Sequence, residues 1–368
     1  MRNQNAVGRR QKKNAMSNST SQIVTPLMIQ DAPGYNSWPF IQIFKGGLVC
    51  TYSRGREHRI DEPCRGVFAR CSWDGGRTWG GENVVVNTAD ACECAEAIGV
   101  DSDGALIQWV RCYGENYENC HHDFYRSVDG LHFERLATVD CEPMPMQIMN
   151  PVLLPDGTLQ SLWFHGYDKE QPTNSWGTFS SKDHGHTWTR RMIEDNLPIE
   201  ELPTEPSAVY LGNGMMLAIA RNDDWETPSS NRQFQLQSTD SGQTWAKFKT
   251  NITDVLLSTP GVVYDAATGL VSNYYYERNQ GWLKRRVMPL EKCWDHPLDW
   301  PAPQIVSQGS KVFADAGNYP CGYDLDGYAC LFIPGTDGYT AIPGRKSGRV
   351  LCGRRFAGAR IGHCKRLR

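Results

Sequence analysis

Apolar segments along the chain are short, and turn signals separate them at a nearly constant interval. Each signal is a glycine-containing pair between two apolar runs, which is typical of a β-hairpin. The clearest example is "EPSAVYLGNGMMLAIAR", where Asn213 and Gly214 separate two strand-like halves. The last glycine of each signal falls at positions 47, 104, 157, 214, 269 and 327, which are 53 to 58 residues apart. Apolar positions nowhere keep the helical period, so the pattern predicts hairpins throughout.

A second series of motifs follows the same interval. The octad Ser-x-Asp-x-Gly-x-x-Trp occurs in "CSWDGGRTW", "SSKDHGHTW" and "QSTDSGQTW", and "RSVDGLHF" is a shortened copy. Their aspartates stand at positions 74, 129, 183 and 240. In such a turn the Ser and Asp side chains can bond the local backbone, Gly permits a positive φ, and Trp packs beneath the strands. We therefore expect the octads to stabilise the fold and to take no part in chemistry.

There are six repeats, each with a hairpin, a third strand and then the octad turn, although the octad has decayed in the fifth and sixth repeats. Repeats of about four strands at this period predict an all-β fold, a six-bladed β-propeller. We expect residues 1–20 to form a flexible basic leader and residues 21–368 to form a single propeller domain. Residues 22–30, "QIVTPLMIQ", should close the last blade as its outer strand beside "GRVLCGRRFAG".

Composition narrows the function classes. The chain has 368 residues, of which 40% are hydrophobic and 21% charged, with a net charge of −3. This balance implies no general attraction to nucleic acid. No run reaches the ~18 apolar residues of a membrane span, and the polar start lacks the apolar stretch of a secretory signal. These features favour a cytoplasmic over a secreted protein.

The thirteen cysteines are scattered, and no pair of Cys-x-x-Cys motifs appears. A structural zinc site is therefore not predicted, and we expect mostly reduced thiols. The stretches Cys92-Glu93-Cys94 and His121-His122 contain residue types that bind metals. Buried thiols and loop histidines are the favoured interpretation, so neither a metal nor a cofactor is expected.

The repeat also predicts which residues reach the face opposite the octads. Counting seven residues beyond the turn glycines leads to three arginines at the ends of second strands, and the longer fifth copy, "LVSNYYYER", ends at a fourth: Arg54, Arg111, Arg221 and Arg278. The starts of first strands bring Glu96, Glu205 and Tyr319 to the same face. Several guanidinium groups around one mouth indicate an anionic substrate.

At these positions the sequence resembles the sialidase (neuraminidase) superfamily, whose Asp-box is the octad. In "TEPSAVYLGNGMMLAIAR" a glutamate opens a hairpin and an arginine closes it, as in that family, which matches Glu205 and Arg221. "NYPCGYDLDGYACLFIPG" resembles the segment that begins with the catalytic tyrosine, here Tyr319. Arg278 matches the third arginine of the family's substrate clamp. Arg285 and Arg286 fit the linear spacing slightly better but lie within a predicted strand.

The first repeat departs from the family pattern. The family has an arginine two residues before a proline, whereas "NSWPF" has Ser37 at that position. The missing guanidinium could come from "YSRGREHR", as Arg54 or Arg56. The family's spacing to its acid/base aspartate leads to Asp61 in "HRIDEPCRG", with three alternatives nearby, Glu57, His58 and Glu62.

The resemblance implies a retaining glycoside hydrolase that acts on an acidic glycan. Sialidases use a tyrosine in place of a carboxylate nucleophile. Tyr319 would be this nucleophile, Glu205 its base, and Asp61 the acid and base at the leaving oxygen. Two alternatives remain open. One is an enzyme on another acidic polysaccharide, such as an endo-acting polysialic-acid hydrolase or a uronate lyase, with Arg111 and Glu96 lining an extended groove. The other is a glycan-binding propeller without catalysis.

Overall fold

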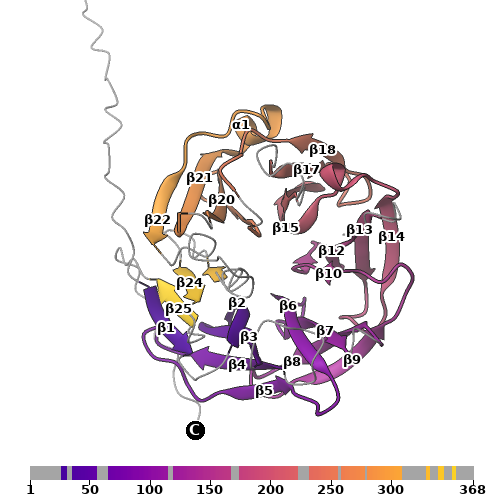
Figure 1. Cartoon of the computed structure of the whole chain (residues 1–368), viewed down its shortest axis with the longest axis vertical. Coiled ribbons are helices and arrows are strands. Elements are labelled where there is room, and N and C mark those ends of the chain that lie inside the picture. Colours follow the sequence, from indigo (N-terminus) through magenta and orange to yellow (C-terminus); the bar gives the residue numbers. More distant parts are fainter. Residues whose placement is uncertain are drawn as a thin grey trace, which may run out of the picture.

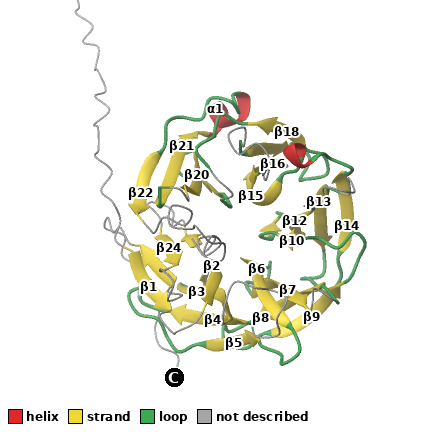
Figure 2. Cartoon of the chain, in the orientation of Figure 1, coloured by secondary structure: helices red, strands yellow, loops and turns green. Residues whose placement is uncertain are grey.

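The structure is a computed structural model that describes residues 26–30, 35–55, 65–114, 119–166, 174–222, 232–255, 258–277, 280–308, 329–331, 339–343 and 350–353. The described chain is an all-β propeller, with small antiparallel sheets arranged around a central axis (Figure 1). Helical structure in the described part is limited to η2 (Ile199–Glu201) and α1 (Leu290–Asp295) (Figure 2). Neither could cross a membrane, and the described residues contain no longer helix.

Five complete sheets follow one another along the chain, and we call them blades 1 to 5. Blades 1 and 2 consist of β2 (Tyr35–Phe44), β3 (Gly47–Gly55), β4 (Gly66–Ser72) and β5 (Asn83–Val86), then β6 (Cys92–Val100), β7 (Leu106–Tyr113), β8 (His121–Ser127) and β9 (Glu134–Val139). Blade 3 consists of β10 (Gln147–Ile148), β11 (Val152–Leu153), β12 (Leu159–His165), β13 (Ser175–Ser181) and β14 (Thr189–Glu194).

Blades 4 and 5 repeat the same plan. They consist of β15 (Thr204–Gly212), β16 (Met215–Arg221), β17 (Phe234–Ser238) and β18 (Ala246–Lys249), then β19 (Gly261–Asp265), β20 (Leu270–Glu277), β21 (Trp282–Pro289) and β22 (Gln304–Gln308). The predicted order of a hairpin, a third strand and an outer strand is present in both blades.

A further sheet joins the two ends of the described chain. Its strand order is β1 (Pro26–Gln30), β25 (Val350–Gly353), β24 (Tyr339–Pro343) and β23 (Ala329–Leu331). Leu27 pairs with Cys352, so the segment predicted as a closing strand does lie beside "GRVLCGRRFAG". The count of six blades stays a prediction, because most of residues 309–349 lie outside the described part.

The octads form compact turns, as expected. In the first, Ser72 Oγ accepts from the Gly76 amide (2.8 Å), and Asp74 accepts from the Thr78 amide and hydroxyl (2.9 and 2.7 Å). The turns of Asp183 and Asp240 repeat these contacts. These bonds outweigh the effect of partial burial and lower the pKa of Asp74 to about 2.

Octad tryptophans also join neighbouring blades. Trp188 of blade 3 packs against Trp109 and Phe124 of blade 2, with ring centroids 4.7 and 4.9 Å apart. Gly185 lies so close to Phe124 that an added Cβ would meet that ring at 1.9 Å, and its φ is +94°. The octad therefore has a structural role at the interface between blades.

Candidate active site

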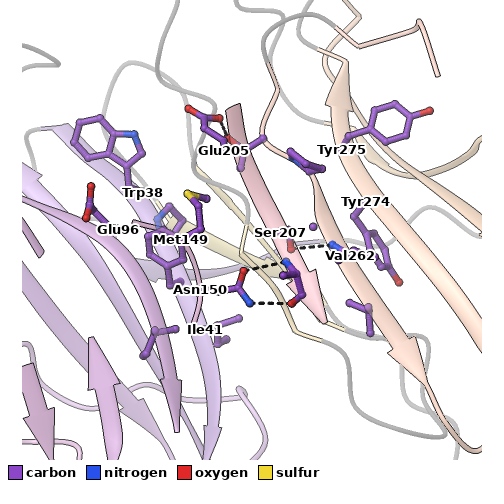
Figure 3. A pocket seen from close by; sticks show the side chains of 18 of the residues that line it. Trp38, Ile41, Glu96, Met149, Asn150, Glu205, Ser207, Val262, Tyr274 and Tyr275 are labelled. Atoms are coloured by element: carbon purple, nitrogen blue, oxygen red, sulfur yellow. Dashed lines mark hydrogen bonds between the residues drawn. The ribbon is translucent and has the colours of Figure 1, made fainter. Parts of the chain in front are cut away.

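A cavity of about 380 Å³ opens among the inner strands of the propeller (Figure 3). One residue near the start of the first strand of each described blade lines it; these rim positions are Trp38, Glu96, Asn150, Glu205 and Thr259. They are 54 to 58 residues apart, and a proline follows each of them except Glu96. The repeat thus delivers one exchangeable side chain from every blade to a common mouth.

A backbone irregularity turns two of these side chains away from their sheets. The pairing of β15 with β16 shifts between Thr204 and Ser207, and Glu205 there has φ +47°. The pairing of β2 with β3 shifts in the same way around Trp38, whose φ is +45°. Residues with side chains rarely adopt this left-handed conformation, and such strain clusters at functional sites. A bulge of this kind re-aims a side chain without moving the neighbouring strands.

Glu205 is buried and lies between two donors. Arg221 Nη1 donates to Glu205 Oε2 over 2.9 Å, and the Thr259 hydroxyl donates to the same oxygen. Arg221 is also buried, so its charge and that of Glu205 compensate each other away from water. Among the described residues both donors use Oε2, which leaves Oε1 for a further group. Glu205 therefore lines the cavity, and Arg221 at the other end of the same hairpin is its buried ion-pair partner.

Glu96 occupies the equivalent position in blade 2 with a different partner. His122 Nδ1 lies 2.7 Å from Glu96 Oε2, and His122 Nε2 lies 3.0 Å from the Pro145 carbonyl. A carbonyl only accepts, so Nε2 donates to Pro145, and the short contact between Nδ1 and Oε2 is a hydrogen bond from the ring to Glu96 or the reverse. Glu96 Oε1 is buried without a hydrogen-bond partner in the described part of the chain. Glu96 therefore lines the cavity with a histidine as its direct partner.

Arg65, which the repeat pattern did not predict as a site residue, approaches Ser37. Arg65 is fully buried, its Nη1 donates to Ser37 Oγ over 3.1 Å, and its guanidinium lies 4.9 Å from the Trp38 ring. Arg65 directly precedes β4, the third strand of blade 1. The prediction from the repeat considered only the starts of first strands and the ends of second strands. The guanidinium beside Ser37 therefore comes from the residue that precedes a third strand.

The structure does not bring Arg54 and Arg111 to the cavity. Arg54 pairs with Glu82 (2.6 Å), and Arg111 donates to the Met146 carbonyl and packs on the Tyr113 ring (4.1 Å). Gly47 is the first residue of β3, whereas Gly214 lies just before β16, so counting seven residues from each glycine does not reach equivalent strand positions. Arg221 pairs with Thr204, and the equivalent residue in blade 1 is Ser53, which pairs with Ser37. Arg54 is therefore one residue beyond the position equivalent to Arg221. A slip of one residue points a side chain to the other face of its sheet.

The remaining candidates divide into two groups. Tyr319, Asp61, Arg56 and Arg278 lie outside the described residues, as do the alternatives Glu57, His58 and Glu62. Arg285 and Arg286 are described within β21, as the sequence suggested. Arg285 donates to Ser272 Oγ (2.9 Å), and Arg286 donates to the Tyr275 hydroxyl (2.6 Å) and pairs with Asp254 (2.7 Å). Both guanidinium groups are engaged within blade 5.

The histidine pair is not in a loop, contrary to expectation. His121 and His122 open strand β8, and alternation along the strand sends their side chains to opposite faces of blade 2. Eight cysteines have side chains that the structure describes, and these eight form no disulfide with one another.

Comparison with known proteins places the fold more firmly than the chemistry. No protein-family model and no curated protein matches the chain. A protein of unknown function from Dyadobacter fermentans has TM-score 0.71 and 14% identity, with 90% of this chain and 97% of that chain covered. The phage phi92 endosialidase has TM-score 0.66 and 11% identity, with 94% and 71% covered.

A third similar structure is an α-L-arabinofuranosidase from Fusarium graminearum, with TM-score 0.61, 13% identity, and 90% and 97% of the two chains covered. The chain therefore has the fold of glycoside hydrolase propellers that act on different sugars. At this low identity the likeness establishes the fold alone, and the substrate must be argued from the site.

Proposed function

We propose that this protein is a glycoside hydrolase that removes sialic acid, or a related sugar with a carboxylate, from glycans. The observation that carries the proposal is the buried Glu205–Arg221 pair, whose Glu205 lines the central cavity. The cavity volume of about 380 Å³ lies within the range of small-molecule sites. The pair supplies a general base next to a guanidinium that can bind an anion.

We assign the nucleophile to Tyr319. The dipeptide Tyr319-Pro320 continues the series of rim positions, in which Glu205-Pro206 and Thr259-Pro260 precede it. A neutral phenol avoids the repulsion that a carboxylate nucleophile would meet from the carboxylate of the substrate. Glu205 takes the phenolic proton while the oxygen attacks the anomeric carbon.

Asp61 completes the reaction in this assignment. It protonates the leaving oxygen in the first step, and it takes a proton from the attacking water in the second. The bond between Tyr319 and the sugar then breaks, and the proton on Glu205 returns to the phenolate. Arg221 and Arg278 hold the substrate carboxylate by charge-assisted hydrogen bonds, with Arg56 as a candidate third contact.

A mechanism-based label tests the proposal. A sialic acid analogue fluorinated next to the anomeric carbon should form a lasting bond to the nucleophile, and mass spectrometry of a digest should find it on Tyr319. Tyr319→Phe should lose the label and cleave a fluorogenic sialoside about 10²–10⁴-fold more slowly. Tyr264→Phe is the matched control, because Tyr264 does not line the cavity. A fully active Tyr319→Phe would exclude this mechanism.

One observation favours a second candidate, a hydrolase that uses two carboxylates and accepts a neutral sugar. Glu96 and Glu205 line the same cavity, and Glu96 is hydrogen-bonded to His122. A carboxylic acid and a carboxylate are the usual pair in glycoside hydrolysis. In that case Glu96→Gln would abolish turnover of arabinofuranosides, and Tyr319→Phe would not.

We also propose that the sheet of β1, β25, β24 and β23 is the sixth blade. Its strand order has the same four-stranded form as blades 1, 2, 4 and 5. Tyr319 precedes Ala329, the first residue of β23, by ten residues, so it would lie in the segment that leads into that blade.

A further inference from the structure

Blade 2 presents a second group of reactive side chains, on the face of β8 that points away from Glu96. Cys112 of β7 pairs directly with His121 of β8, and Asp123 follows two residues later on the same face. Asp123 Oδ2 lies 3.8 Å from Cys112 Sγ and 3.8 Å from His121 Nε2. The three ligand atoms all lie within 4.8 Å of one another. Strands β6 to β9 that hold this group adjoin one another in Figure 1.

Outer contacts orient two of these groups toward a common point. His121 Nδ1 lies 2.9 Å from the Asn119 carbonyl, which can only accept, so Nδ1 carries a proton. The neighbouring Asp123 carboxylate raises the pKa of His121. In the neutral ring the Nε2 lone pair faces Asp123 Oδ2, so a metal ion between the two atoms would take the place of the proton on Nε2. The Thr138 hydroxyl holds the other carboxylate oxygen, Oδ1, over 2.6 Å. Metal-binding histidines and carboxylates characteristically have such outer partners.

We propose that Cys112 Sγ, His121 Nε2 and Asp123 Oδ2 bind a divalent transition metal ion, with zinc as the best match. Thiolate, imidazole and carboxylate are the ligands that zinc prefers. Tetrahedral zinc with ordinary bond lengths would hold these atoms roughly 3.3–3.6 Å apart, so small rotations of the side chains suffice. Binding converts the Cys112 thiol to a thiolate and releases its proton to solvent.

Glu93 lies outside this group of three and would have to shift toward it to provide a fourth ligand. It pairs with Cys112 across β6 and β7 and is only 1% exposed. Its Oε1 accepts from Thr88, whereas Oε2 is buried with no hydrogen-bond partner among the described residues. Because Glu93 is next to the connection from blade 1, the ion would tie that connection to three strands of blade 2.

Arg135 is compatible with this site. Its Nη1 lies 3.3 Å from Asp123 Oδ2, and its side chain is 58% exposed, so it can turn toward solvent. A thiolate and two carboxylates would leave the bound dication with a net negative charge, which a nearby Arg135 offsets. The ion would also fix the start of β8, where His122 contacts Glu96 on the opposite face of the sheet.

Cobalt and zinc titrations of the full-length protein test the site. Metal-free protein titrated with Co²⁺ should develop thiolate-to-cobalt absorption in the near ultraviolet, and Zn²⁺ should displace the cobalt. Cys112→Ser should lose this band. Thr138→Val, which removes only an outer contact, should weaken Zn²⁺ binding roughly 10–100-fold. Cys141→Ser and His132→Ala are matched controls that should bind as the wild type does.

Two results would overturn the proposal. One is a wild-type protein that, when folded by circular dichroism, gives no thiolate band and binds no Zn²⁺, with His121 doubly protonated by NMR. The other is an unchanged Co²⁺ spectrum in Cys112→Ser. If Cys112→Ser does not fold, the proposal would instead be overturned by a folded Thr138→Val variant whose affinity for Zn²⁺ equals that of the wild type.

Discussion

Glu96 and Glu205 occupy equivalent rim positions in blades 2 and 4, yet their partners differ in kind. Glu205 faces Arg221, a cation that does not titrate in the physiological range, and Glu96 faces His122, which can gain or lose a proton. Each glutamate contacts its partner through Oε2. The repeat therefore fixes where a carboxylate stands, and one residue on a neighbouring strand decides what that carboxylate can do.

Replacing Glu205 should have the largest effect. We expect Glu205→Gln to reduce turnover of a fluorogenic sialoside about 10²–10⁴-fold, because the amide cannot accept the proton of the nucleophile. Glu205→Gln retains the size of the side chain, so circular dichroism and the melting temperature should show a folded protein. Full activity of this variant would remove the functional difference between the two glutamates.

Arg221 tests the other half of the blade 4 pair. Arg221→Ala removes a charge-assisted hydrogen bond worth roughly 1.5–3 kcal/mol, so binding of an acidic sugar should weaken about 10–150-fold. Isothermal titration with a sialic acid inhibitor measures this change, and Arg54→Ala provides the control because Arg54 pairs with Glu82 instead. Equal losses in the two variants would refute the role of Arg221. The free energy of unfolding should also decrease, since Glu205 would be left buried without its cation.

His122 tests the blade 2 pair. We expect His122→Asn to lower kcat by less than about tenfold, since it removes the hydrogen-bond partner of Glu96 but retains Glu205. The measurement is kcat for the fluorogenic sialoside, with His132→Asn as the control on an exposed histidine. If the two-carboxylate candidate is correct, His122→Asn should instead cost two orders of magnitude or more.

The octads should give the smallest effect, on stability and not on activity. Hydrogen bonds from Thr187 and Ser181 outweigh partial burial and lower the pKa of Asp183 to about 2. Because the pKa is lower in the folded state, this contribution is complete above about pH 4 and is lost as pH falls toward 2. Asp183→Asn should lower the free energy of unfolding by about 1 kcal/mol at pH 7 and flatten its dependence on acid pH. Urea unfolding at several pH values measures both effects, and exposed Asp195→Asn should change neither.

The sequence predicted the parts of the molecule that depend on repetition. The glycine interval led to the hairpins, the octads led to the turns between the third and outer strands within a blade, and the segment before Gln30 was placed beside its partner near Cys352. Glu205 and Arg221 could be paired because they are the two ends of one hairpin. Local order and a constant period suffice for such inferences.

What the sequence did not predict depends on contacts between strands that the repeat leaves free. Arg65 reaches Ser37 from the start of a third strand, and His122 reaches Glu96 from β8. The misplacement of Arg54 has a simpler cause, a difference of one residue in where the turn glycine lies. Neither the third-strand contacts nor the exact turn geometry follows from a hydrophobic pattern.

The pairing of β1 with β25 constrains how the protein is made. Strands near opposite ends of the described chain lie side by side, so this edge stays open until the ribosome has released the later strand. Blades 1 to 5 contain their own hairpins and can form in turn during synthesis. The last contact joins segments of very high sequence separation, which is a slow kind of step. Until then β1 remains an unpaired edge, a place where another nascent chain could add a strand.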